Sequence, residues 1–256
     1  MRVEREMERK IERIKEILRD LGLECARTIE ERVDLQFDAL KYLHQNLNDT
    51  ELFLKLVIAN SLVSYQLSGR GEDWWWEFAK HFSEKKPEES IVKAYSEFLP
   101  ASRANKRLTE GKIKRLKKAE GFLERLTLGE LEDYYFGRMT SLREELARAL
   151  NSRKDAKTVV FAVKMFGYGG RIAFGRFVPY PMEIEIPDDV RINAYTKRFT
   201  KEPPPQFWSR IAKEVNIPPL HIDSILWPAL GEIPEVKIRL RKYCRDWTKV
   251  VELTNL

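Results

Sequence analysis

The sequence has few of the residues that most often hold metal ions. Its two cysteines, Cys25 and Cys244, lie far apart, and neither has a second cysteine nearby in the chain. Iron–sulfur clusters and four-cysteine zinc sites need more thiolates than this, so both are excluded. Three histidines are also too few for a histidine-rich metal centre. We therefore expect a protein that works without a metal or another cofactor.

The sequence also lacks a long uncharged segment. Its longest stretch without a charged residue, from Leu56 to Gly69, is too short for a membrane-spanning helix, which takes about 20 apolar residues. The first residues, MRVEREMERK, contain no apolar core of a signal peptide. We therefore expect a cytoplasmic protein with no contact to a membrane.

The sequence does contain the material for a large core and a basic surface. Hydrophobic residues make up 43% of the 256 residues and aromatic residues 11%, which argues against a disordered chain. The formal net charge is +6. A positive charge suits a polyanionic partner because Lys and Arg neutralise phosphates, yet many basic proteins bind nothing acidic. The charge alone is only weak evidence for nucleic acid.

Apolar residues recur at helical spacing along most of the chain, and one such stripe stops at Gly22. Residues 168–187 break this pattern with Gly, Pro and aromatic residues, as expected for a connector. The pattern predicts an all-α protein of two helical lobes. We expect a central lobe over residues 50–175 and a second lobe formed by residues 1–49 together with 176–256.

A strongly basic run covers residues 103–118, RANKRLTEGKIKRLKK, in which the only acidic residue is Glu110. The run is a candidate contact for nucleic-acid phosphates. The alternative is a solvated helix face near a lobe boundary, which the sequence alone slightly favours.

The helix expected to start at Lys157, with Asp155 as its N-cap, has two different faces. At about 100° per residue, Lys157, Phe161 and Lys164 share one side, and the opposite side carries only apolar residues. The positive end of the helix dipole and burial both disfavour a charged amine at this position, which helps a nucleophile. For this segment alone, a surface lysine at a helix start is the commoner explanation.

Several segments taken together resemble one known family. They are KTVVFAVKMFGYGG from Lys157, IPDDVRI around Asp189, IPPLHIDSILW farther on, and DLQFDALKYL and SLVSYQLSGRGEDWWWEFAKHF in the N-terminal half. These segments resemble the archaeal GO glycosylases, an 8-oxoguanine-excising branch of the helix-hairpin-helix glycosylase superfamily. The resemblance implies two helical lobes with a helix-hairpin-helix and a cleft between the lobes. It also implies a DNA-repair enzyme that acts on double- or single-stranded DNA containing oxidised guanine. The sequence leaves the oligomeric state open, and a monomer is the default expectation.

The resemblance assigns the chemistry to a lysine and an aspartate. Lys157 resembles the family's catalytic lysine, which attacks the sugar C1′, expels the base and forms a Schiff base, after which β-elimination cuts the strand. Asp189 resembles the conserved aspartate, whose carboxylate stabilises positive charge on the sugar and assists activation of the amine. Its neighbour Asp188 is a rival, and in a purely structural interpretation one of the two caps the helix that follows Pro187.

The resemblance further implies a pocket for the extruded base, because a flipped purine needs aromatic walls and hydrogen bonds to its edges. The expected walls are Trp75, Phe161 and Trp227, although at most one or two of the three consecutive tryptophans 74–76 can face a pocket. Taken singly, a tryptophan is more often a core residue and Gln36 a surface residue. The polar groups expected at this site are Gln36, Lys164 and Asp223.

The expected hairpin turn, NSRKDA, departs from the superfamily pattern because it contains no glycine. Glycine-rich hairpins bind phosphate through backbone N–H groups. We expect Arg153 and Lys154 to contact DNA phosphates here instead.

A second hypothesis is a non-catalytic helical nucleic-acid-binding module, which needs the charge and the aromatic residues but neither Lys157 nor Asp189. A small-molecule hydrolase is poorly supported, since the sequence has no GxSxG motif, no metal-ligand cluster and no phosphate-binding loop.

Overall fold

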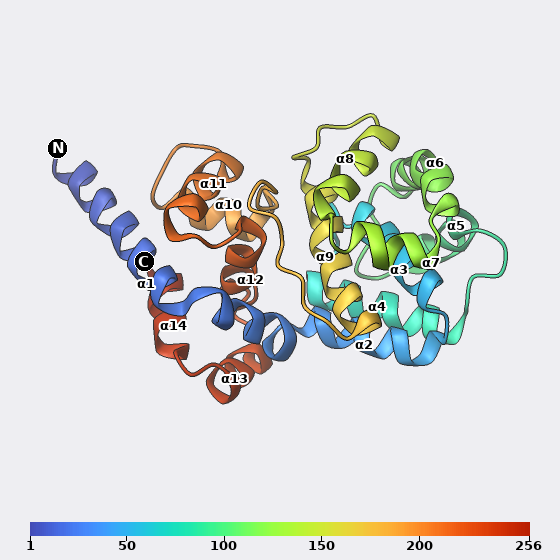
Figure 1. Ribbon diagram of the computed structural model, residues 1–256, viewed down its shortest axis with the longest axis horizontal. Coiled ribbons are helices and arrows are strands. Elements are labelled where there is room, and N and C mark those ends of the chain that lie inside the picture. Colours follow the sequence, from blue (N-terminus) through green and yellow to red (C-terminus); the bar gives the residue numbers. More distant parts are fainter. The chain divides into compact units, whose positions relative to one another are not determined.

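The computed structural model describes residues 1–256, and every regular element in it is a helix. Loops join the helices, and no β-strand is present (Figure 1). The all-α fold class predicted from the apolar spacing is therefore confirmed. No helix is both long enough and apolar enough to span a membrane.

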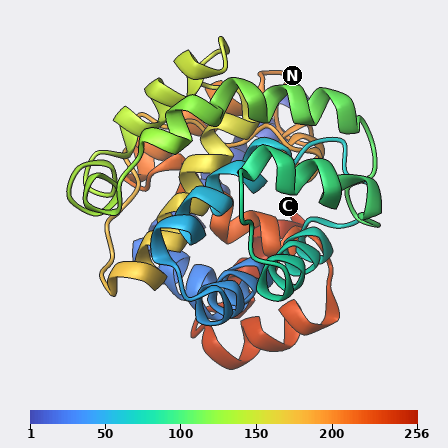
Figure 2. The same cartoon turned by 90° about the vertical axis from the view of Figure 1, so that its right-hand side faces the viewer.

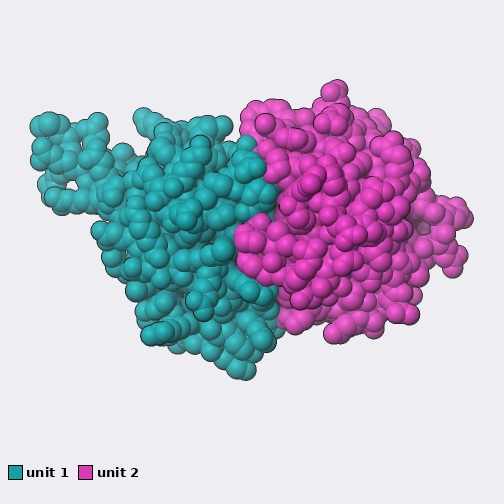
Figure 3. Space-filling model, viewed as in Figure 1, with its two compact units in different colours: residues 1–34, 180–256 teal, residues 35–179 magenta.

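The chain forms two compact units, which Figure 3 shows in different colours. Unit 1 is Met1–Asp34 with Tyr180–Leu256, and unit 2 is Leu35–Pro179. The helices of unit 1 are α1 (Arg2–Thr28), the π-helical turn η1 (Ile29–Val33), α10 (Val190–Thr196), α11 (Pro204–Val215), α12 (Pro219–Leu230), α13 (Pro234–Tyr243) and α14 (Trp247–Asn255). The helices of unit 2 are α2 (Leu35–Leu47), α3 (Thr50–Leu62), α4 (Gly71–Glu84), α5 (Ile91–Ala101), α6 (Thr109–Arg125), α7 (Leu128–Glu130), the π-helical turn η2 (Leu131–Tyr135), α8 (Met139–Ala149) and α9 (Lys157–Phe174).

The boundaries of the units differ from those of the expected lobes, although both ends of the chain do share one unit. Residues 35–47 were expected in the second lobe, but they form α2, which packs on α4 and α9 within unit 2. The buried side chains of α2, among them Leu40 and Leu43, supply this contact. The first boundary between the units therefore lies at Asp34–Leu35, and the second lies at Pro179–Tyr180.

Helices α3 and α9 lie side by side at the centre of unit 2 (Figures 1 and 2). Nearly all of α3 is buried, as expected for a helix that is apolar on every side. A Cβ atom on Gly169 of α9 would lie 3.1 Å from Leu54 of α3, and one on Gly170 would overlap the ring of Phe136. The two glycines therefore set how closely α9 packs, and with it the position of Lys157 at its start.

Unit 1 joins the two ends of the chain. Two helical segments meet at Gly22 within α1. The φ of 67° at Gly22 suits glycine and is not helical, so the first segment ends in a kink where the apolar stripe stops. Beyond α1, Glu30 Oε2 lies 2.9 Å from Nδ1 of His221 in α12, and Nε2 of this ring accepts from the Tyr180 N–H at 3.1 Å. Because Nε2 is an acceptor, Nδ1 carries the proton and donates it to Glu30. This buried pair ties the end of α1 to α12.

Candidate active site

Lys157 is the first residue of α9, and its setting depends on how this helix begins. Ala156 occupies the N-cap position and offers no side-chain acceptor. Asp155, the expected cap, instead binds Arg153 through two N···O contacts of 2.9 and 2.6 Å. The predicted cap is therefore wrong, because an arginine two residues earlier takes the carboxylate. The positive end of the α9 dipole has no capping side chain to offset it.

The two faces of α9 differ as the sequence predicts. Its apolar back is fully buried. On the other side, Lys157 and Phe161 are half-buried. Lys164 on this side is only 1% exposed, and its ammonium lies 5.7 Å from the centre of the Tyr168 ring. The face that carries Lys157 therefore combines a partly accessible amine with a buried one.

Of the three consecutive tryptophans, Trp75 is the one that meets the Lys157 face of α9. Its ring centre lies 5.9 Å from that of Phe161, in an edge-to-face arrangement. Trp74 is a core residue, fully buried and stacked on Phe98. Trp76 is half-buried. The structure thus brings together two of the three predicted aromatic walls, Trp75 and Phe161.

Gln36 lies near the start of α2 and is 1% exposed. This burial rules out the surface glutamine that its residue type alone suggests. Since α2 packs on α9, the side chain is held in the same unit as Lys164. Two of the predicted polar groups are therefore buried in unit 2, where a buried polar group needs hydrogen-bonding partners.

A lysine that the sequence analysis did not single out lies close to Lys157. Lys112 of α6 is fully buried, donates a hydrogen bond to Asn105 Oδ1, and lies 5.0 Å from the centre of the Tyr65 ring. Burial, together with the smaller effects of the charges of Arg107 and Lys157, lowers the pKa of Lys112 to about 8. The burial of Lys112 could have been predicted from the sequence, because position 112 falls on the apolar face of α6.

Asp189 is the N-cap of α10 in unit 1, where its Oδ1 accepts from the Ile192 N–H at 2.9 Å. The side chain is half-buried. Its rival Asp188 is exposed and accepts from Asn193 Nδ2 at 3.1 Å. The capping role foreseen for one of the two aspartates therefore belongs to Asp189, the residue also chosen for catalysis.

Asp223 and Trp227 lie one turn apart on α12 in unit 1. Asp223 is 2% exposed and Trp227 half-buried. Arg191 of α10 covers one face of the indole, with Cζ 3.9 Å from the ring centre, and its Nη1 donates to the Trp227 carbonyl at 3.1 Å. Sequence reasoning missed Arg191, because no local spacing connects α10 with α12. One face of the predicted aromatic wall is thus occupied by a guanidinium.

The predicted phosphate contacts lie in the turn between α8 and α9, two helices that pack together. Arg153 and Lys154 are both exposed. The guanidinium of Arg153 is held by Asp155, so of the two side chains Lys154 is the one with no carboxylate beside it. Either side chain is accessible to a phosphate.

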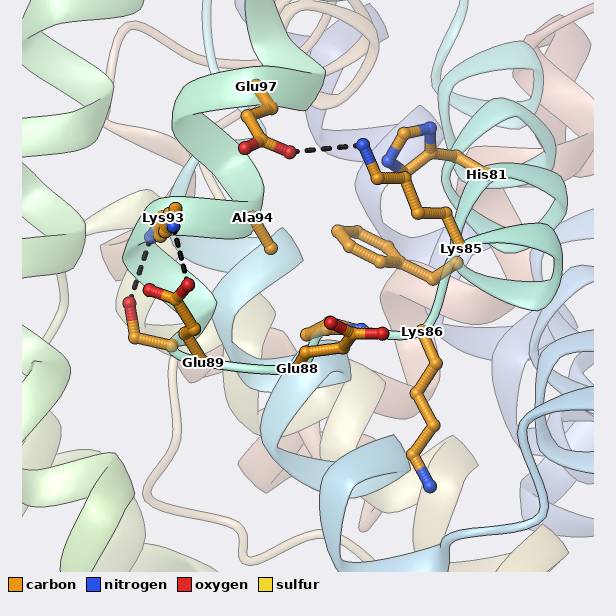
Figure 4. A pocket seen from close by; sticks show the side chains of 11 residues that line it. His81, Lys85, Lys86, Glu88, Glu89, Lys93, Ala94 and Glu97 are labelled. Atoms are coloured by element: carbon orange, nitrogen blue, oxygen red, sulfur yellow. Dashed lines mark hydrogen bonds and ion pairs between the residues drawn. The ribbon is translucent and has the colours of Figure 1, made fainter.

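A cavity of about 240 Å³ lies between α4 and α5, and no predicted site residue lines it (Figure 4). Two of its lysines pair with glutamates of the wall: Lys85 with Glu97 at 3.1 Å, and Lys93 with Glu89 at 2.6 Å. Such paired, exposed charges are typical of a surface ion network. We therefore place the candidate site at the start of α9.

Comparison with known proteins identifies the class. The family model described as N-glycosylase/DNA lyase (AGOG) matches residues 15–254, which is nearly the whole chain. The chain therefore belongs to the N-glycosylase/DNA lyase family. As a member it is an enzyme that combines glycosylase and lyase activities, and the non-catalytic binding module is set aside.

Individual relatives agree with this assignment. The chain is 66% identical to an N-glycosylase/DNA lyase of Thermococcus kodakarensis, over 97% of this chain and 95% of the relative. It is 47% identical to that of Methanococcus maripaludis, over 97% and 100%. It is also similar to the crystal structure of 8-oxoguanosine-complexed Pa-AGOG, the 8-oxoguanine DNA glycosylase from Pyrobaculum aerophilum. That match has a TM-score of 0.79, an identity of 27%, and covers 96% of each chain.

Proposed function

We propose that the protein removes 8-oxoguanine from DNA through a Schiff base on Lys157 and then cuts the strand by β-elimination. The observation that carries this proposal is the position of Lys157: half-buried at a helix start without a side-chain cap, on the same face as Phe161 and Lys164. The 8-oxoguanosine bound to the similar Pyrobaculum protein supports oxidised guanine as the substrate. We further propose that the enzyme acts on DNA in the cytoplasm and as a monomer.

In the proposed reaction, the unprotonated amine of Lys157 attacks C1′ of the damaged nucleotide, and the bond from C1′ to the base breaks. The base leaves with the electron pair and takes up a proton. Loss of a proton from the new C–N centre and opening of the sugar ring give the Schiff base. Removal of a C2′ proton then expels the 3′ phosphate and breaks the strand. Asp189 supplies the negative charge that stabilises the cation developing on the sugar.

The extruded base needs flat walls and a polar edge. The walls in this proposal are Phe161, Trp75 and Trp227. Oxidised guanine differs from guanine by an N7–H donor and an O8 acceptor, so a buried carboxylate such as Asp223 can accept from the new donor. The remaining polar groups in the proposal are Gln36 and Lys164.

DNA phosphates are contacted, in this proposal, by the turn between α8 and α9, which takes the place of the superfamily's hairpin. The exposed positions of Arg153 and Lys154 support this role. Without glycine in the turn, side chains rather than backbone N–H groups supply most of the attraction.

The test is covalent trapping. A duplex that contains 8-oxoguanine is incubated with the enzyme and borohydride, which reduces a Schiff base to a stable amine. We expect a protein–DNA adduct with the unchanged enzyme and with the control Lys213→Gln, an exposed lysine of α11, and none with Lys157→Gln. An adduct that persists in Lys157→Gln would show that another amine, such as Lys164, is the nucleophile. Binding without any adduct in the unchanged enzyme would reject the Schiff-base step.

A further inference from the structure

Two cations beside Lys157 have no carboxylate partner. The buried ammonium of Lys112 contacts an amide oxygen and an aromatic ring, while the charges that act on it, those of Arg107 and Lys157, repel it. Burying a charge without an opposite charge is costly. In contrast, Lys15 and Lys55, whose side chains are 12% exposed, each pair with glutamates.

Arg115, one turn further along α6, is the second such cation. Its Nη2 donates to Thr158 Oγ1 at 2.6 Å, and its buried Nε has no hydrogen-bond partner. Burial lowers the pKa of the guanidinium, and the nearest opposing influence is the hydroxyl of Tyr65 rather than an acid. Arg115 is therefore a partly desolvated fork of donors attached to the first turn of α9.

The start of α9 adds further positive potential at the same place. This helix has 18 residues, and its N-cap carries no acceptor side chain. Thr158, which binds Arg115, and Lys157 are its first two residues. Positive charge thus accumulates at one point, and the carboxylate at the start of this helix, that of Asp155, is already paired with Arg153. An anion bound there would offset the cost of this arrangement.

We propose that Arg115 and the first turn of α9, with the nearby buried charge of Lys112, bind a phosphate of the DNA backbone next to the nucleotide attacked by Lys157. This inference rests on the proposed function. If Lys157 attacks C1′ of a nucleotide, the phosphates on either side of that sugar also lie near the start of α9. A guanidinium fits the oxygens of a phosphate through two parallel donors. Lys112 is not exposed, so it contributes positive charge to the site but no direct contact with the phosphate.

The first experiment measures the anion site without DNA. Thermal unfolding is followed in inorganic phosphate and in chloride at equal ionic strength. We expect phosphate to raise the Tm of the unchanged protein and of Arg125→Gln, an exposed arginine at the other end of α6, but not that of Arg115→Gln. Equal responses of all three proteins would overturn the site.

The second experiment identifies the anion as a DNA phosphate. Neutral methylphosphonate linkages are placed one at a time on either side of 8-oxoguanine, and Kd is measured as a function of salt. We expect one linkage to weaken binding by the unchanged protein about tenfold, and to leave Arg115→Gln with no further loss. Arg115→Gln on natural DNA should lose about the same factor and reduce the salt slope by about one.

Two results would contradict the proposal: tolerance of every flanking methylphosphonate by the unchanged protein, or an equal loss in Arg125→Gln. The methylphosphonate series is measured with the unchanged protein, so its result does not depend on whether Arg115→Gln folds correctly. Failure of the Schiff-base proposal is seen separately, as binding without a trapped adduct. A trapped adduct with no linkage dependence would instead reject this phosphate site alone.

Discussion

At the scale of single residues, the polar side chains predicted for the base pocket are distinguished by their burial. Gln36, Lys164 and Asp223 are each at most 2% exposed, although residues of these types are mostly found at protein surfaces. Their types and spacing could be read from the sequence, but their burial could not, since it depends on helices that are distant in the chain. The same limit hid Arg191, which reaches Trp227 from another helix.

Asp189→Asn separates the proposed catalytic role of this residue from its observed role as a helix cap. Asparagine caps helices about as well as aspartate, so we expect the free energy of unfolding to change by less than about 0.5 kcal/mol. Loss of the negative charge should lower turnover about 100-fold or more, with DNA binding retained. Asp189→Ala serves as the comparison and should also lose about 1 kcal/mol of stability. Full turnover by Asp189→Asn would show that the negative charge of Asp189 is not needed for catalysis and that the residue acts only as a helix cap.

Lys112→Met should change how stability depends on pH. The pKa of Lys112 is about 8 in the folded protein and near its ordinary 10.5 in the unfolded chain, so between these values the unfolded chain binds more protons. The unchanged protein should therefore gain about 1–3 kcal/mol relative to Lys112→Met as the pH rises from 8 to 10.5. The facing groups Arg107, Lys157 and Arg115 remain in both proteins. Parallel urea-unfolding curves at all pH values would show that Lys112 titrates normally.

At the scale of helices, the periodicity of apolar residues predicted the class and the faces of α9. It failed where two local interactions compete. Asp155 has the residue type of an N-cap, but Arg153 is near enough to take its carboxylate. Gly22 has the residue type of a helix stop, and the backbone does leave helical geometry there, with a second helical segment of α1 following directly. The type of a residue limits the local conformations it can adopt, and contacts with the rest of the fold determine which of them occurs.

Gly170→Ala should disturb α9 at its closest contact. The added methyl group would overlap the Phe136 ring, so we expect a loss of about 1–3 kcal/mol in urea unfolding. The matched control is Gly121→Ala in α6, where nothing lies within 4 Å of the new Cβ atom. There the better helix propensity of alanine should add up to about 1 kcal/mol. Equal effects of the two changes would mean that α9 is not closely packed at Gly170.

At the scale of the whole molecule, both ends of the chain build unit 1. The sequence analysis also expected both ends in one lobe, but it grouped residues 35–47 with them, because the apolar pattern of α2 does not show which helices it packs on. The termini are held by long-range contacts such as Arg13 with Glu252, at 2.7 Å. Cys25 and Cys244, which appeared unrelated in the sequence, have Sγ atoms 3.3 Å apart in the buried interior of this unit.

Mild oxidation with a disulfide reagent should therefore join Cys25 to Cys244. The sulfur atoms need to approach to about 2.05 Å, a shift of little more than 1 Å. Closing so long a loop can stabilise the fold by up to about 5 kcal/mol. We expect the number of titratable thiols in denaturant to fall from two to zero and the Tm to rise. Cys25→Ser under the same treatment should show no rise, and a rise of equal size there would assign the effect to something other than this bond.

The central claim is that the amine of Lys157 bonds to the sugar, and its most direct test is to locate that bond. The borohydride-trapped adduct with 8-oxoguanine DNA is digested with nuclease and protease, and the modified peptide is sequenced by mass spectrometry. We expect the sugar remnant on Lys157. A remnant on Lys164, Lys112 or the N-terminal amine of Met1 would contradict the claim.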